Sequence, residues 1–299
     1  MTRATRHATP AMVTSDKPKR SNLAVRLFTA ALAIPVLLWM LLLGPHWVWA
    51  GFVLGPGLFV AAHELFAMTL SGATRLRVLA TAITLSWGAA LYFGLAQPDL
   101  ARHFPLFVCG LSLCSTLAAI TQPLPNELAG PRMAWLVAGP LYIAGPLAIL
   151  AATHALPEGG KWILLSMMLA WFADTAGYFA GRFLGGKLFG PRKLSPNISP
   201  NKTWEGALGG LFGALVASLL AHFWYLPVLP LVHGVLLALI AGPLGICGDL
   251  VESLIKRSTG TKDSGWIIPG HGGLIDRIDA LMFTATTTGI YARLLLPDG

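Results

Sequence analysis

Side chains suited to phosphate and metal chemistry are concentrated in residues 249–279, in a chain with only 11% charged residues. Four of these residues are Asp249, Glu252, Ser253 and Lys256. They occupy positions i, i+3, i+4 and i+7, a spacing that places their side chains on one face of a helix. Two further acids, Asp276 and Asp279, open the last apolar segment. Carboxylates that converge from two helix ends suit a hard cation with oxygen ligands. The pattern predicts a Mg²⁺ site made by Asp249, Glu252, Asp276 and Asp279.

The same residues also have structural interpretations. Glu252 and Lys256 would form an ordinary ion pair on an exposed helix end, and an acid in the first turn of a helix caps it and complements its dipole. Against this stands the position of Asp249 in the run LGICGDL, directly beside hydrocarbon. A carboxylate there is costly unless a cation or a partner compensates its charge, which favours the functional interpretation.

The segment between the two groups of acids predicts a phosphate-binding loop. Its Lys and Arg residues supply positive charge, and its glycines let backbone N–H groups approach an anion at the N-terminus of the following helix. The candidate phosphate- and substrate-binding residues are Ser253, Arg257, Lys262, Asp263, His271, Gly272, Gly273 and Arg277. His271 is not expected to bind the metal in so oxygen-rich a site. Acids and bases together indicate a metal–polyphosphate ligand.

Two upstream segments add candidates. Asp174 lies inside an apolar segment, where an acid is a functional candidate, with a hydrogen bond to Tyr178 as the structural alternative. Three polar residues precede the apolar segment at 206–226: Ser199, Lys202 and Thr203. Lys202 suits a phosphate, whereas Ser199 or Thr203 would serve equally well as a helix N-cap. The pair His63-Glu64 is interpreted with equal weight as structural or functional.

Membrane helices have to position these residues. The chain is 55% hydrophobic with a mean hydropathy of +0.66, whereas soluble domains carry about 25% charged residues. This composition predicts an all-α, polytopic integral membrane protein with about nine spans. The spans are expected at 24–43, 47–69, 78–96, 105–121, 133–153, 162–181, 206–226, 229–248 and 280–296. We expect a disordered basic tail at 1–22, N-terminal transmembrane helices over 23–160 and a catalytic transmembrane region over 161–299.

The charge distribution predicts the orientation. Nine spans place the tail and the polar loops at 182–205 and 249–279 on one side, and the first of these loops carries five basic residues and one acid. Basic loops favour the cytoplasmic side, so the active site is expected at the cytoplasmic face of a cell (inner) membrane. The net charge of +8 is attributed to this bias, and no nucleic-acid partner is expected.

Residues 253–279 resemble the signature of the phosphatidate cytidylyltransferases (CDP-diacylglycerol synthases). The matching parts are SLIKR at 253–257, Lys262-Asp263 and PGHGGLIDRID at 269–279. The segments around Asp174 and at 199–206 (SPNKTWEG) are also similar to the family. The resemblance covers about 170–299, and Asn201 stands where the family often has a basic residue.

The resemblance implies that CTP and phosphatidic acid, a membrane lipid, react to CDP-diacylglycerol and pyrophosphate with Mg²⁺ and a second cation. The lipid phosphate is ionised at neutral pH, so no strong general base is required, and the main task is to neutralise charge on the phosphates. The expected catalytic residues are Asp249, Lys256, Asp276 and Asp279. Assembly as a homodimer is left open.

Two other functions have to be considered. A CTP-dependent lipid alcohol kinase is the nearest enzyme alternative, because polyprenol and phytol kinases are distantly similar. A transporter would also carry an intramembrane acid, but the charges here gather in loops at one face. The GHGGLIDRID and SPNKTWEG segments favour the cytidylyltransferase.

Overall fold

The computed structural model describes residues 19–267 and 272–295. Most of the predicted tail at 1–22 and the candidate His271 therefore lie outside the described residues. Helix α1 (Lys19–Leu42) begins within the range predicted as tail.

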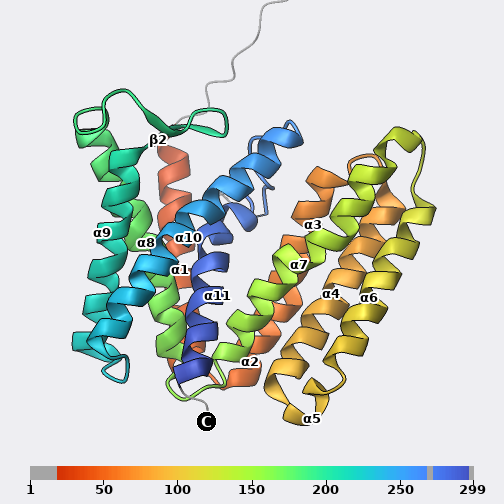
Figure 1. The fold of residues 1–299 in the computed structure, drawn as a ribbon, viewed down its shortest axis with the longest axis horizontal. Helices are drawn as coiled ribbons and strands as arrows, with labels where there is room; N and C mark the ends of the chain where they lie inside the picture. Colours follow the sequence, from red (N-terminus) through yellow and green to blue (C-terminus); the bar gives the residue numbers. More distant parts are fainter. Residues whose placement is uncertain (1–18, 268–271, 296–299) are drawn as a thin grey trace, which may run out of the picture.

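Helices make up most of the described structure, as predicted (Figure 1). After α1 come α2 (His46–Phe52), a π-helical turn at Val53–Gly57, α3 (Leu58–Thr69), α4 (Thr74–Ala96), the short α5 (Pro98–Ala101), α6 (Phe104–Ala118) and α7 (Ala129–Thr153). The C-terminal region contains α8 (Gly159–Leu184), α9 (Trp204–Leu220), α10 (Leu231–Ser258) and α11 (Ile275–Leu295). A 3-10 turn follows α6 (Ala119–Thr121), another precedes α7 (Asn126–Leu128), and a π-helical turn follows α9 (Ala221–Tyr225).

Seven helical segments of the described residues are long and apolar enough to cross a membrane: 46–69, 74–96, 104–121, 126–153, 159–184, 204–225 and 231–258. They coincide with the second to the eighth predicted spans. The first and ninth predicted spans also fall on helices, α1 and α11, which are not among these seven segments. The chain is therefore a helical membrane protein with seven such segments in its described part.

A small β-hairpin is the one departure from the all-α prediction among the described residues. β1 (Lys193–Ser195) pairs antiparallel with β2 (Ser199–Thr203), and Ser195 lies opposite Ser199. The repeated SPN sequence at 195–197 and 199–201 thus provides the turn and the returning strand. Two strands were not expected there because Pro and Asn are uncommon in strands.

Helices α8 and α9 lie side by side along their lengths, and small residues allow this close contact. A Cβ added to Gly213 of α9 would lie 2.3 Å from the backbone oxygen of Phe172 in α8. Within a membrane, lipid is as apolar as the side chains, so helices associate largely through such tight packing. The α8–α9 pair forms one wall of a cavity that Asp174 of α8 and Lys202 of the hairpin also line.

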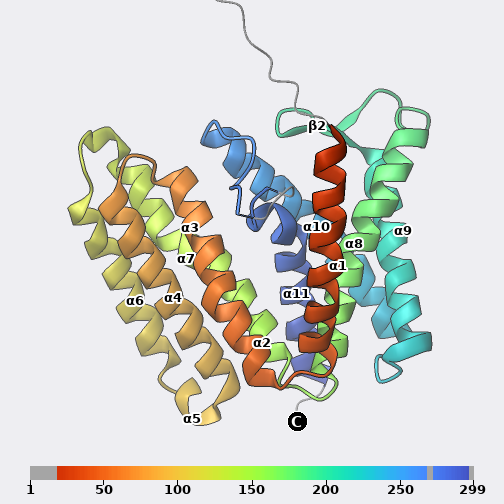
Figure 2. The ribbon, with the colours of Figure 1, turned by 180° about the vertical axis from the view of Figure 1, so that it is seen from behind.

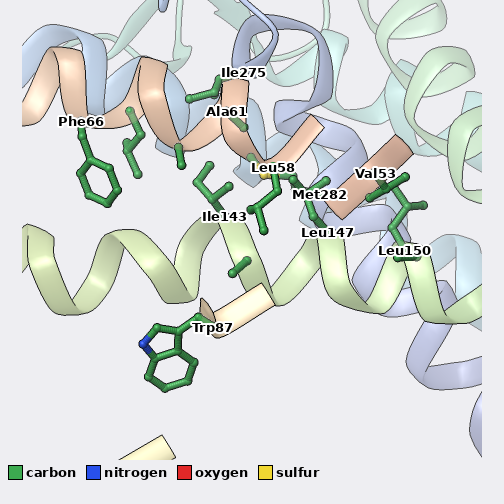
Figure 3. Packing of buried hydrophobic residues seen from close by; sticks show 14 of the residues in the cluster. Val53, Leu58, Ala61, Phe66, Trp87, Ile143, Leu147, Leu150, Ile275 and Met282 are labelled. Atoms are coloured by element: carbon green, nitrogen blue, oxygen red, sulfur yellow. The ribbon is translucent and has the colours of Figure 1, made fainter. Parts of the chain in front are cut away.

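Helix α11 joins the two halves of the chain. Its buried residues Ile275 and Met282 pack in one cluster with Leu58 and Ala61 of α3 and with α7 (Figure 3). A second buried cluster, around Trp162 and Leu165, connects α8, α9, α10 and the last turns of α11. The predicted N-terminal and catalytic regions therefore share a core.

The polar elements gather at one end of the molecule. The hairpin, the end of α10 and the beginning of α11 lie at this end, as does the last turn of α3 (Figure 1). Seen from behind, α1 runs beside α8 from the same end (Figure 2). The sequence pattern predicted this common end for residues 182–205 and 249–279.

Candidate functional site

A cavity of about 620 Å³ lies between α8, α9, α10 and the hairpin. Its apolar wall comes mainly from glycine and alanine residues of α8 and α9. Its polar and charged lining consists of Asp174, Tyr178, Arg182, Asn201, Lys202, Thr203 and Asp249. The cavity therefore offers both cationic and carboxylate groups at the polar end of the helices, as a phosphate-containing ligand with a cation requires.

Lys202 and Asp249 form an ion pair across this cavity. The Lys202 Nζ lies 2.7 Å from Asp249 Oδ2, with 23% and 32% of the two side chains exposed. Ser253 Oγ donates to Asp249 Oδ1 over 3.3 Å, one turn further along α10. Residues from the hairpin and from α10, predicted separately, thus meet in one site.

Asp174 lines the same cavity from α8. It lies within electrostatic range of Asp249 and Lys202. No hydrogen bond joins Asp174 to Tyr178 among the described residues, and the Tyr178 hydroxyl accepts from Arg182 Nη1 at 3.1 Å. Asp174 is therefore an acid in the wall of the cavity, facing the Lys202–Asp249 pair.

A second, more buried charged cluster lies between α10 and α11. Lys256 Nζ is 2.6 Å from Glu252 Oε2 and 2.8 Å from Asp276 Oδ1. The three side chains are 14%, 2% and 8% exposed. Two acids thus share one lysine away from water, and Glu252 Oε1 has no hydrogen-bond partner among the described residues.

The second oxygen of Asp276 is held by the loop that precedes α11. Asp276 Oδ2 accepts the backbone N–H groups of Ser264 (3.0 Å) and Gly273 (3.1 Å). Leu274 and Ile275 donate their N–H groups to Glu64 of α3, each over 3.0 Å. The N–H groups expected to face a phosphate at this helix end, that of Gly273 included, are bound by carboxylates of the protein.

Asp279 connects the two clusters. Its Oδ1 accepts the N–H of Ala280, and the side chain lies within electrostatic range of Asp249, Asp174 and Lys256. Seven of the predicted residues therefore belong to one electrostatically coupled region: Asp174, Lys202, Asp249, Glu252, Lys256, Asp276 and Asp279. The predicted catalytic residues Asp249, Lys256, Asp276 and Asp279 all lie in it.

The other candidates have different surroundings. Thr203 is the N-cap of α9, since its Oγ1 accepts the Gly206 N–H at 3.0 Å, and Ser199 belongs to the hairpin pairing. The side chains of four loop and helix-end residues are exposed at the polar end: Arg257, Lys262, Asp263 and Arg277. Gly272 has a φ of 83°, which glycine adopts readily.

Three polar residues near the site were not among the predicted site residues. Glu64 binds the loop before α11, and Ser264 donates from its Oγ to Glu64 Oε2 at 3.1 Å. Tyr142 of α7 has a buried hydroxyl with no partner among the described residues, within electrostatic range of Glu252 and Asp279. The sequence signal for Glu64 was an acid in an apolar span; Ser264 and Tyr142 gave none.

The donors suit Mg²⁺ in type, because the carboxylates of α10 and α11 adjoin one another and one buried carboxylate oxygen lacks a partner. Among the described residues, no three His, Cys, Asp or Glu side chains are arranged closely enough to hold a metal by themselves. Mg²⁺ in nucleotide sites is commonly bound by one or two carboxylates plus substrate phosphates. The arrangement therefore fits a metal that the nucleotide helps to bind.

Comparison with known proteins decides the family. Residues 24–295 match the sequence model described as the cytidylyltransferase family. The chain belongs to this family. The phosphatidate cytidylyltransferase of Brucella suis is 33% identical over 291 residues, covering 93% of this chain and 96% of the relative. That of Haemophilus influenzae is 36% identical over 65% of this chain and 61% of the relative, and that of Staphylococcus aureus is 46% identical over 42% and 46%.

The match extends beyond the region that carries the sequence signature. The signature and its upstream segments lie in residues 170–299, whereas the family match begins at residue 24. The apolar helices α1 to α7 are therefore part of the cytidylyltransferase fold. This agrees with the shared core of α3, α7 and α11.

Proposed function

We propose that this member of the cytidylyltransferase family transfers the cytidylyl group of CTP to phosphatidic acid. The products are CDP-diacylglycerol, a precursor for phospholipid synthesis, and pyrophosphate. The observation that carries the proposal is the cavity at the polar end of the helices, in which Lys202, Arg182, Asp249 and Asp174 surround space for phosphates. The relatives named phosphatidate cytidylyltransferase support the choice of substrates.

The reaction needs charge neutralisation more than proton transfer. A non-bridging oxygen of the lipid phosphate attacks the α-phosphorus of CTP, and the bond from that phosphorus to the oxygen bridging to the β-phosphate breaks. Pyrophosphate leaves with the electron pair of that bond. The attacking oxygen is already ionised at neutral pH, so Lys202, Lys256 and Arg182 serve to hold and neutralise the phosphates.

Mg²⁺ is proposed as the cofactor, held by one or two carboxylates from the set Asp249, Glu252, Asp276 and Asp279 together with phosphate oxygens. When bound, it withdraws charge from the α-phosphate and the departing pyrophosphate. The ion pairs of Lys202 with Asp249 and of Lys256 with Glu252 and Asp276 keep these carboxylates compensated and oriented. The resemblance to the family also implies a second cation, and the proposal includes it.

The polar end is proposed to face the cytoplasm, with nine membrane spans that include α1 and α11. The basic residues of the hairpin region and of the α10–α11 loop support this orientation through the positive-inside bias. CTP then arrives from water, and phosphatidic acid arrives laterally with its head group at the same depth.

Two labels on CTP separate this function from that of a lipid alcohol kinase. The purified full chain in vesicles containing phosphatidic acid and Mg²⁺ should move label from the α-phosphate of CTP into the lipid fraction, but not label from the γ-phosphate. Transfer of the γ-label to a lipid alcohol would support the kinase. Absence of both transfers, with substrates and folding verified, would contradict both enzyme assignments.

A further inference from the structure

Glu64 is a buried acid of the N-terminal half of the chain that binds the loop leading into α11 in the C-terminal half. It lies in the middle of α3 and is 2% exposed. Its partner Ser264 is 200 residues away in the chain. A buried carboxylate is costly unless it is hydrogen-bonded, so its position requires these partners.

The carboxylate of Glu64 is fully engaged with the loop that precedes α11. Oε1 accepts the Leu274 N–H, and Oε2 accepts both the Ile275 N–H and the Ser264 hydroxyl. These bonds satisfy backbone donors at the start of α11 that have no partner within the helix. The adjoining residue Gly273 leaves no spare room, because a Cβ there would lie 2.0 Å from Ser264 Oγ.

The same short segments also hold Asp276. Ser264 uses its hydroxyl for Glu64 and its N–H for Asp276 Oδ2. The N–H of Gly273 goes to Asp276, and the next two N–H groups along the chain go to Glu64. The other oxygen of Asp276 binds Lys256. A continuous chain of bonds thus runs from α3 to the charged cluster of α10.

We infer that Glu64 is a positioning residue for the cytidylyl transfer: it fixes the loop N–H groups that orient Asp276, and through Asp276 the phosphate-binding Lys256. The inference rests on the proposed function. Because Glu64 contacts loop donors and not the cavity, it acts through other residues. The N-terminal half then contributes to the reaction as well as to the membrane anchor.

The test compares three variants of the full chain with the wild type in vesicles. Glu64→Gln keeps the size of the side chain but replaces one acceptor oxygen by an NH₂ group that faces N–H donors. Ser264→Ala removes one of the Glu64 partners at lower risk to folding. Glu127→Gln is the matched control, because Glu127 is exposed between α6 and α7.

Hydrogen exchange and kinetics should change together. In Glu64→Gln we expect the backbone N–H groups of Ser264 and of residues 273–275 to exchange about tenfold faster. This is the factor that corresponds to the loss of one hydrogen bond to a charged group. The KM for CTP should rise by a similar factor, about tenfold, since Lys256 loses its fixed orientation. The KM of Glu64→Gln for phosphatidic acid should change much less. Ser264→Ala should raise hydrogen exchange and the KM for CTP by smaller factors. Glu127→Gln should change neither.

Two results separate failure of this inference from failure of the proposed function. Unchanged KM values in Glu64→Gln and Ser264→Ala, with only the yield of folded enzyme lowered, would overturn the positioning role and leave a structural one. A wild type that forms no CDP-diacylglycerol would reject the proposed function. In that case, unchanged exchange at Ser264 and residues 273–275 in Glu64→Gln would still overturn the inference.

Discussion

Two lysines compensate the acids on the site-facing side of α10. Lys202 reaches Asp249 from the hairpin, and Lys256 lies between Glu252 and Asp276. The second group is nearly buried, so its charges are poorly screened by water. Removing one partner of such a group leaves an uncompensated charge, which costs more than the pair itself contributes. We therefore expect Lys256 to stabilise the fold in addition to its proposed role in phosphate binding.

Replacement of Lys256 by Met should reveal this structural role. We expect the free energy of unfolding to fall by about 3–5 kcal/mol, the range for breaking a buried ion pair. Denaturant unfolding of the purified protein in detergent measures it. Lys161→Met is the control, because Lys161 and its partner Glu158 are 41% and 48% exposed; such surface pairs contribute about 0–1 kcal/mol. Equal losses in the two variants would contradict the account of the Lys256 cluster.

At the scale of elements, the wall of the cavity depends on close contact between α8 and α9. Gly213 lets the two backbones approach, and the upstream candidates Asp174 and Lys202 are positioned by the same pair of helices and the hairpin between them. An alanine normally stabilises a helix relative to glycine by about 1 kcal/mol. At a close contact this gain is outweighed by the clash that the added methyl group causes.

Gly213→Ala and Gly110→Ala should therefore differ in sign. A Cβ on Gly213 meets the Phe172 oxygen at 2.3 Å, whereas one on Gly110 of α6 has no atom within 4 Å. We expect Gly213→Ala to lower the melting temperature of the detergent-purified protein and to reduce transfer activity. Gly110→Ala should leave both unchanged or raise the melting temperature slightly. A stable and fully active Gly213→Ala variant would show that the α8–α9 contact is less restrictive than described.

The sequence predicted the two helix ends of the site but not the third element that supports them. Regular spacing identified the face of α10 and the acids at the start of α11, because helical geometry relates residues a few positions apart. Glu64 could not be assigned in this way, since its partner Ser264 is 200 residues distant and no local pattern relates them. The hairpin was missed because its proline-rich sequence lacks strand propensity.

For the molecule as a whole, composition predicted the class and most of the membrane segments. Seven predicted spans coincide with helices that are long and apolar enough. Helix α11 carries the ninth predicted span, and the acids Asp276 and Asp279 near its beginning make it less apolar than the other predicted spans.

Cysteine labelling tests the proposed orientation. The three native cysteines, all within apolar helices, are replaced by Ser, and single cysteines are placed at Asn197 in the hairpin turn or at Asp99 in α5. In intact cells a membrane-impermeant maleimide should label Asp99→Cys, while Asn197→Cys should react only after the membrane is opened. The reverse pattern would contradict a cytoplasmic site.

In the proposed reaction, CTP and phosphatidic acid bind and react in the cavity between α8, α9 and α10. The most direct measurement is transfer of the α-phosphate label of CTP into lipid by wild-type protein, by Asp249→Asn and by the exposed control Asp99→Asn, all in the same phosphatidic acid vesicles with Mg²⁺. We predict CDP-diacylglycerol formation by the wild type and the control, and a loss of at least about 100-fold in folded Asp249→Asn, typical of removing one charge-stabilising group. Near-normal transfer by Asp249→Asn, or no labelled lipid from the wild type, would contradict the account.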